Sequence, residues 1–194
     1  MAITAAMVKE LREMTGAGMM DCKKALTETN GDMDAAVDVL KKSGAAKMEK
    51  KQSRIAAEGI ARVAVNGNVA VVAEVNSETD FVAKNETFQE FVQTVADTAL
   101  ASDLNGGANG EDIEALLATN GLSDLLVEKT ATIGEKLSVR RFAKVTGDAV
   151  ASYIHGGGRI GVVIAADGAS DDAAKEALTN IAMQVAAMNP QYIS

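Results

Sequence analysis

The amino-acid sequence predicts an α+β protein in which a short helical module precedes two similar hairpin-plus-helix units. Three helix-period patterns with start and stop signals fill residues 1–44. Two pairs of apolar, strand-like runs follow, and each pair is joined by a Gly-containing turn and followed by an amphipathic helical pattern. We therefore expect a three-helix module at 1–44, a partly helical basic linker at 45–58, a first α+β subdomain at 59–145 and a second at 146–194.

Helix signals recur three times in the first module. Thr4 can cap the first helix and Gly16 can end it, while the second helix ends at Asn30-Gly31. The third begins after Asp32 and is expected to end at Ser43-Gly44. In the first helix Met7, Val8, Leu11 and Met14 share a face, and the third helix is expected to bury Met33, Ala36, Val37 and Leu40. The second helix carries Met19, Met20, Cys22, Ala25 and Leu26. A unit this small offers a binding face but hardly an enclosed active site.

The two hairpin patterns rest on turn chemistry. In the first, runs at 62–65 and 69–75 flank Asn66-Gly67-Asn68, whose Asn-Gly pair supplies the positive φ angles of a tight turn. In the second, runs at 150–154 and 160–164 flank a turn with three consecutive glycines. The helices that follow are expected to bury Phe88, Phe91, Val92 and Val95, after an Asn85 cap, and Leu178, Ile181, Ala182, Val185 and Ala186. Between the units we expect a flexible turn at 105–110, short helices at 111–118 and 123–129, and a strand at 137–145.

Composition narrows the class of partner and the compartment. The 194 residues carry a net charge of −8, which disfavours a dominant nucleic-acid role, because affinity for phosphate backbones comes from clustered Lys and Arg. A protein partner fits better. The single cysteine cannot form an internal disulfide, which suits a reducing compartment. Neither a signal-peptide pattern nor an apolar stretch of about 18 residues is present, so we expect a cytoplasmic location.

The loop Thr79-Asp80-Phe81-Val82 stands out because it belongs to neither neighbouring pattern. The strand-like run ends at Val75, and the next helix is expected to start only at about Glu86. An aromatic residue beside an acidic one in such a loop is either tucked beneath the loop or presented to another molecule. On local sequence alone the tucked arrangement is the more ordinary one.

Other residues that could suggest a functional site have ordinary structural explanations. Gly16-Ala17-Gly18 is not a phosphate-binding loop, because no Gly-Lys-Ser/Thr follows it. Cys22 lies on an apolar helix face without a nearby His, which favours a buried thiol over a nucleophile. His155, the only histidine, is expected to be a polar turn residue. Met183 and Met188 are expected in a helix core or at a helix end.

Several strings together resemble one family. They are Thr15 to Leu26 (TGAGMMDCKKAL), Thr79 to Val82, Ile133 to Lys136, Tyr153 to Gly156, Arg159 to Val162 and Ile181 to Met183. In this order they resemble bacterial elongation factor Ts, and the resemblance runs along all 194 residues. It implies a guanine-nucleotide exchange factor that expels GDP from the GTPase elongation factor Tu. It also implies that the first module is ubiquitin-associated-like and docks onto the GTP-binding domain of that partner.

The resemblance carries roles to individual residues. It implies that Thr79, Asp80, Phe81 and Val82 dislodge Mg²⁺ from elongation factor Tu, and that Met19, Met20 and His155 contact that partner. The protein would have no catalytic residue, cofactor or metal of its own. Two alternatives stay open: an adaptor that binds another protein through residues 1–44, and, more remotely, an enzyme that uses Cys22 or His155.

The sequence also departs from the family pattern. Three glycines separate His155 from Arg159, where many members have two residues, and Gln184 stands where the family often has His. The extra glycine could reposition His155. Most members continue into a helical hairpin and a C-terminal module beyond the position of Ser194. We therefore expect this chain to lack the usual C-terminal region, either as a short member or as a fragment.

Overall fold

A computed structural model describes residues 3–168 and 170–192, and the fold is α+β as predicted. Contacts divide the chain into two compact units. The helical unit comprises the residues up to Ile55 together with Ser123–Leu137, and the sheet unit comprises Ala56–Leu122 together with the residues from Ser138 onward. Residues 123–137, which were predicted in the first α+β subdomain, group by their contacts with the N-terminal helices.

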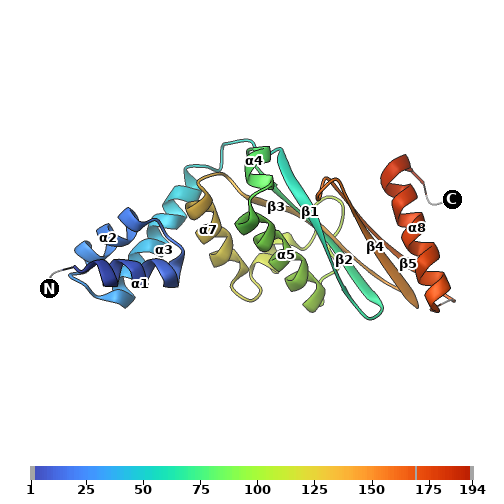
Figure 1. The fold of residues 1–194 in the computed structure, drawn as a ribbon, viewed down its shortest axis with the longest axis horizontal. Helices are drawn as coiled ribbons and strands as arrows, with labels where there is room; N and C mark the ends of the chain where they lie inside the picture. The colour runs from blue at the N-terminus through green and yellow to red at the C-terminus, as the bar shows by residue number, and fades with distance from the viewer. Residues whose placement is uncertain (1–2, 169, 193–194) are drawn as a thin grey trace. The chain divides into compact units, whose positions relative to one another are not determined.

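The helical unit contains α1 (Ala5–Thr15), α2 (Met19–Glu28), α3 (Met33–Glu49) and nearly all of α7 (Leu122–Ile133) (Figure 1). The predicted caps form: the Thr4 side chain accepts from Met7 N, and the Asp32 side chain accepts from Ala35 N. Gly16 ends α1 with φ of 64°. The core of the three-helix module consists of Val8, Leu11, Cys22, Ala25, Leu26 and Ala36.

The predicted end of the third helix at Ser43-Gly44 was wrong, because α3 continues to Glu49. Gly44 is buried inside the helix, where an added Cβ would lie 3.1 Å from Val127 Cγ1 of α7. The glycine therefore serves close helix packing and is not a stop signal. Met14 was expected on the same face as the core residues of α1 but is 59% exposed.

The first half of the sheet unit is an antiparallel sheet with a helix packed on it. Its strands are β1 (Glu58–Asn66), β2 (Val69–Ser77) and β3 (Ser138–Thr146), in the order β1-β2-β3. Helix α5 (Glu86–Ala101) packs along β1 and β2 and buries the predicted Phe88, Phe91, Val92 and Val95. The hairpin turn lies within the predicted Asn66-Gly67-Asn68, but it consists of Gly67 and Asn68 alone. Asn66 pairs with Val69, and Gly67 supplies the positive φ, 58°.

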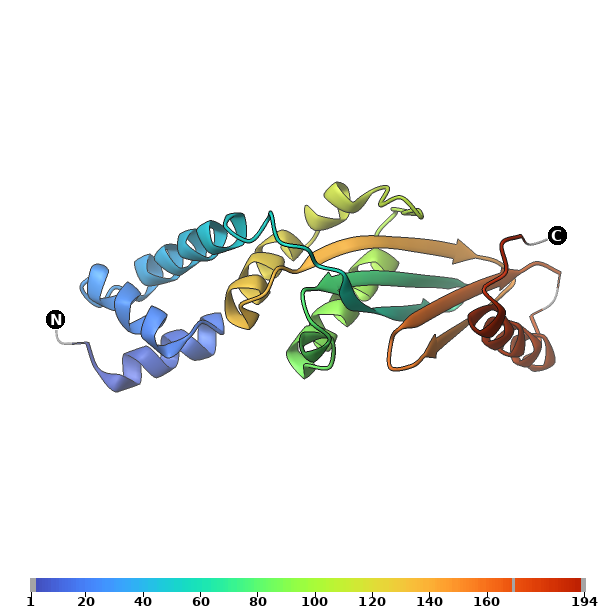
Figure 2. The same cartoon turned by 90° about the horizontal axis from the view of Figure 1, so that it is seen from above.

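The second half repeats the hairpin and helix. Strands β4 (Ala149–His155) and β5 (Ile160–Ala166) pair antiparallel, and α8 (Asp172–Met188) packs on both (Figures 1 and 2). The short helix α6 (Ile113–Leu117) contacts β3. Leu178 and Ala182 are buried as predicted, whereas Ile181 and Met183 are exposed, so the inward face of α8 is narrower than the sequence suggested. Within residues 3–168 and 170–192, no helix is long and apolar enough to cross a membrane.

Glycines let the second hairpin approach the first sheet at backbone distance. A Cβ on Gly161 would lie 2.8 Å from Val72 Cγ2, and a Cβ on Gly158 would lie 3.0 Å from Ala61 O. Ala61 N donates to Gly158 O at 2.7 Å. The turn between β4 and β5 is therefore fixed on β1 by a main-chain hydrogen bond, and only glycine fits at the closest points.

A similar close approach within the β1–β2 pair, at Gly59, can be tested with Gly67 as the matched control. Gly59 has φ of 142° and an added Cβ would lie 2.2 Å from Val75 O, whereas Gly67 has φ of 58° and open space. We predict that Gly59→Ala lowers the free energy of unfolding by about 4 kcal/mol, because neither backbone can move aside. Gly67→Ala should cost about 1 kcal/mol, from its left-handed conformation alone. Urea denaturation of both variants measures the difference, and equal losses would contradict the close approach.

Candidate functional site

The loop singled out in the sequence forms a one-turn helix, α4 (Asp80–Ala83), between β2 and α5 (Figure 1). The side chain of Thr79 caps it by accepting from Val82 N at 3.4 Å. Ser77, fully buried at the end of β2, donates from Oγ to Thr79 O at 3.0 Å. The short helix is therefore tied at its start to the rigid end of a central strand.

Phe81 is presented to solvent and not tucked beneath the loop. Its side chain is 81% exposed, while Val82 is half-buried and Ala83 is buried. Val82 and Ala83 face the protein interior and fix the backbone of this turn. The ring of Phe81 therefore projects into solvent from a fixed backbone. A single exposed apolar side chain is ordinary by itself, but a ring on an anchored turn is accessible to another molecule.

Asp80 lies in the first turn of α4, where its carboxylate forms an ion pair with Lys84 Nζ at 2.8 Å. The hydrogen bond from Lys84 and the charge of Lys84 lower the pKa of Asp80, and the charge of Arg159 adds to this effect. Thr79, and not Asp80, caps the helix. The carboxylate is thus ionised and accessible beside the exposed ring.

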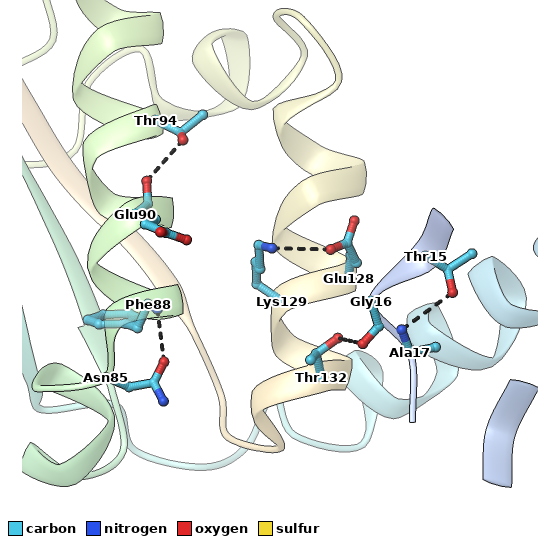
Figure 3. A network of polar contacts seen from close by, with 10 residues as sticks. All are labelled: Thr15, Gly16, Ala17, Asn85, Phe88, Glu90, Thr94, Glu128, Lys129 and Thr132. Atoms are coloured by element: carbon cyan, nitrogen blue, oxygen red, sulfur yellow. Dashed lines mark hydrogen bonds and ion pairs between the residues drawn. The ribbon is translucent and has the colours of Figure 1, made fainter. Parts of the chain in front are cut away.

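The start of α5 follows α4 almost directly. The Asn85 side chain accepts from Phe88 N at 3.2 Å, as predicted (Figure 3). Phe88 is fully buried, so the residues just after α4 are fixed both by a cap and by the core. The one-turn helix therefore sits between two anchored segments.

His155 ends β4 and is exposed, and its Nδ1 lies 3.0 Å from the hydroxyl oxygen of Tyr153. Gly156, Gly157 and Gly158 all adopt positive φ, at 59°, 71° and 111°. The extra glycine is thus accommodated in a turn that stays bonded to β1 through Gly158 O. Both α4 and this turn belong to the sheet unit.

Met19 and Met20, which the resemblance assigns to partner contact, occupy the first turn of α2 in the helical unit. They are 56% and 75% exposed, so the structure leaves them accessible. Cys22, in the same helix, is fully buried, and burial raises the pKa of its thiol, which agrees with an inert core residue. Preceding α2, Gly16 O accepts from Thr132 Oγ1 of α7 at 3.4 Å (Figure 3).

Sequence reasoning missed two polar residues that contact the site. Arg62 of β1 and Gln89 of α5 are half-buried and hydrogen-bonded to each other. The one signal in the sequence that could have found them was Arg62, a charged residue inside an apolar strand pattern. A charge on an edge strand is ordinary, so this signal did not point to a site. Across the described chain, no group of three or more His, Cys, Asp or Glu side chains is placed to hold a metal ion.

Comparison with known protein families gives one finding. The family model described as elongation factor TS matches residues 78–194, more than half of the chain. The match includes α4 and the His155 turn but does not extend to Met19 and Met20. It therefore covers most of the sheet unit, where the exposed ring and carboxylate lie.

The ion pair of α4 is expected to respond to pH. Because the pKa of Asp80 is lowered in the folded chain, the pair stabilises the fold above the ordinary aspartate range and is lost as the pH falls through the lowered value. We predict that Lys84→Met raises the pKa of Asp80, measured by NMR titration of its carboxyl carbon. Lys9→Met, which removes the similar Lys9–Glu13 pair of α1, should leave that titration unchanged. An unaltered Asp80 titration in Lys84→Met would refute the assignment.

Proposed function

The chain belongs to the elongation factor Ts family, translation elongation factors whose partner is elongation factor Tu, and we propose that it binds elongation factor Tu·GDP and promotes GDP release. The observation that carries this proposal is the exposed Phe81 beside the ionised Asp80 on an anchored turn. Such an element can enter a neighbouring protein without first refolding. A cytoplasmic location remains a prediction from the single cysteine and the composition.

Exchange requires no covalent chemistry in this chain, so we propose that it is not an enzyme in its own right. By linkage, a factor that binds the nucleotide-free GTPase more tightly than the loaded one weakens nucleotide binding by the same ratio. Nanomolar nucleotide affinity corresponds to about 12 kcal/mol. Much of such affinity depends on phosphate contacts and on the bound Mg²⁺. Disturbing the coordination of this Mg²⁺ is therefore the simplest way to weaken GDP binding.

In the proposed mechanism, Thr79 to Val82 supply the disturbance. The ring of Phe81 would wedge between helices near the Mg²⁺ of elongation factor Tu, and Asp80 would compete for groups that hold it. Octahedral Mg²⁺ tolerates little distortion, so a small displacement is sufficient. The anchored turn supports this proposal, because an inserted ring can displace the helices of the partner only if the backbone of α4 does not move instead.

Docking would come from separate surfaces. Met19 and Met20 offer exposed apolar area on the helical unit, and His155 offers a polar contact on the sheet unit. We propose that these residues add affinity while α4 lowers the barrier to release. Affinity and rate should therefore be separable by mutation.

The first test removes the wedge. Phe81→Ala should slow the maximal rate of release of fluorescent GDP from elongation factor Tu by about tenfold, the equivalent of about 1.4 kcal/mol. Stability should change little, because the ring is 81% exposed. Tyr192→Ala, which removes another exposed aromatic ring, is the control and should release GDP at the parent rate. Parent-like release by Phe81→Ala would show that the wedge assignment is wrong.

The second test concerns docking. Met20→Ala should raise the concentration of the chain needed for half-maximal GDP release by about threefold, because a partly exposed apolar side chain contributes modestly to binding. The maximal rate should stay unchanged. Met14→Ala removes a methionine that is 59% exposed on α1 and should have no effect. If residues 1–44 instead retained a different protein in pull-downs and Met20→Ala left exchange unaltered, the adaptor alternative would be favoured.

A further inference from the structure

A continuous set of hydrogen bonds joins the turn after His155 to the end of α4. Arg62 Nη1 donates to Gly157 O at 3.4 Å, and Arg62 Nη2 donates to Gln89 Oε1 at 2.9 Å. Gln89 Nε2 then donates to Ala83 O, the last residue of α4, at 3.3 Å. All these residues lie in the sheet unit. Two side chains thus connect the two elements that the proposed function assigns to partner contact.

We propose that Arg62 and Gln89 are positioning residues that hold α4 and the β4–β5 turn in a fixed relation, so that Phe81 and His155 meet the partner as one surface. This inference rests on the proposed function. Neither residue needs to touch the partner. Their role is to keep the backbone of α4 in place when the ring of Phe81 presses against the partner.

The physical need arises from the length of α4. A helix of four residues has no intrahelical partners for most of its end groups and is not stable by itself. Thr79 satisfies its start, and Lys84 N and Asn85 N satisfy Phe81 O and Val82 O. Ala83 O is bound by Gln89, which makes this side chain the anchor of the C-terminal end.

The chemistry at each position is specific. Only a guanidinium presents two donors in a rigid fork that reaches a backbone carbonyl and a side-chain amide at once. The amide of Gln89 accepts from Arg62 with one atom and donates to Ala83 O with the other, which neither a carboxylate nor an ammonium group can do. Arg62 is also close to the turn itself, since a Cβ on Gly158 would lie 2.8 Å from its Nη1.

The substitution Gln89→Glu separates the two links. A carboxylate still accepts from Arg62 but cannot donate to Ala83 O. We expect the maximal rate of GDP release from elongation factor Tu to fall about five- to tenfold, with the half-saturating concentration within about twofold of the parent value. Gln93→Ala is the matched control, because Gln93 lies in the next turn of α5 and donates to Val63 O of β1 at 3.1 Å and to Asp97 Oδ1 at 3.0 Å. It should release GDP at the parent rate.

A double-mutant cycle tests whether the two residues act together. Arg62→Ala and Gln89→Ala should each slow the maximal rate, and the double variant should be no slower than the slower single variant. Arg62→Lys replaces Arg62→Ala if the latter fails to fold, and should be nearly as slow. Rate losses that multiply in the double variant, parent rates in both single variants, or an equal loss in Gln93→Ala would each overturn the inference.

A second readout needs no partner. In the free chain, deuterium exchange of the amides of Ala83, Lys84 and Asn85 should be at least about fivefold faster in Gln89→Glu than in the parent or in Gln93→Ala. Unchanged exchange at these amides refutes the positioning role whatever the GDP assay gives. If instead the amides respond but the parent chain does not release GDP, the proposed function fails and the contact assigned to Gln89 stands.

Discussion

The structure around the candidate site depends on the support given to one exposed aromatic ring by a helix too short to be stable alone. Phe81 is 81% exposed, and an unsupported loop would collapse it onto the nearest apolar surface. The collapse is prevented because both ends of α4 are held by neighbours: buried Ser77 and the Thr79 cap at the start, and Gln89 and the capped α5 at the end. The site is therefore a property of the whole sheet unit and not of four residues.

The second constraint is the close contact between the two hairpins. Gly158 and Gly161 allow the β4–β5 hairpin to approach β1 and β2 at distances that no side chain would permit. The hydrogen bond from Ala61 N to Gly158 O then fixes the turn that carries His155. A longer glycine run would ordinarily make such a turn mobile, because glycine loses the most conformational entropy on folding. Here the anchor lies at the third glycine, so the turn stays fixed on β1 despite its three glycines.

Much of the fold followed from local patterns. The helix caps at Thr4, Asp32 and Asn85 and the buried face of α5 were predictable because they depend on neighbours in sequence. The error at Gly44 has a tertiary cause, since the glycine makes room for Val127, which lies far away in the chain. The same holds for the site. The resemblance located α4, but the support of this turn also depends on the hydrogen bond between Arg62 and Gln89, which lie 27 residues apart, and no local pattern reveals that contact.

In the proposed mechanism, the fixed position of Phe81 would let one surface raise the exchange rate more than the affinity. A flexible loop would lose conformational entropy when it entered the partner, and part of the binding energy would offset that loss. A turn that is already held in one conformation would avoid much of this loss. In the proposed mechanism, the burial of the exposed ring would then be available to oppose the contacts around the metal in elongation factor Tu. Because the ring is exposed in the free chain, its burial is gained only on insertion, which is the condition for a wedge to favour the nucleotide-free state.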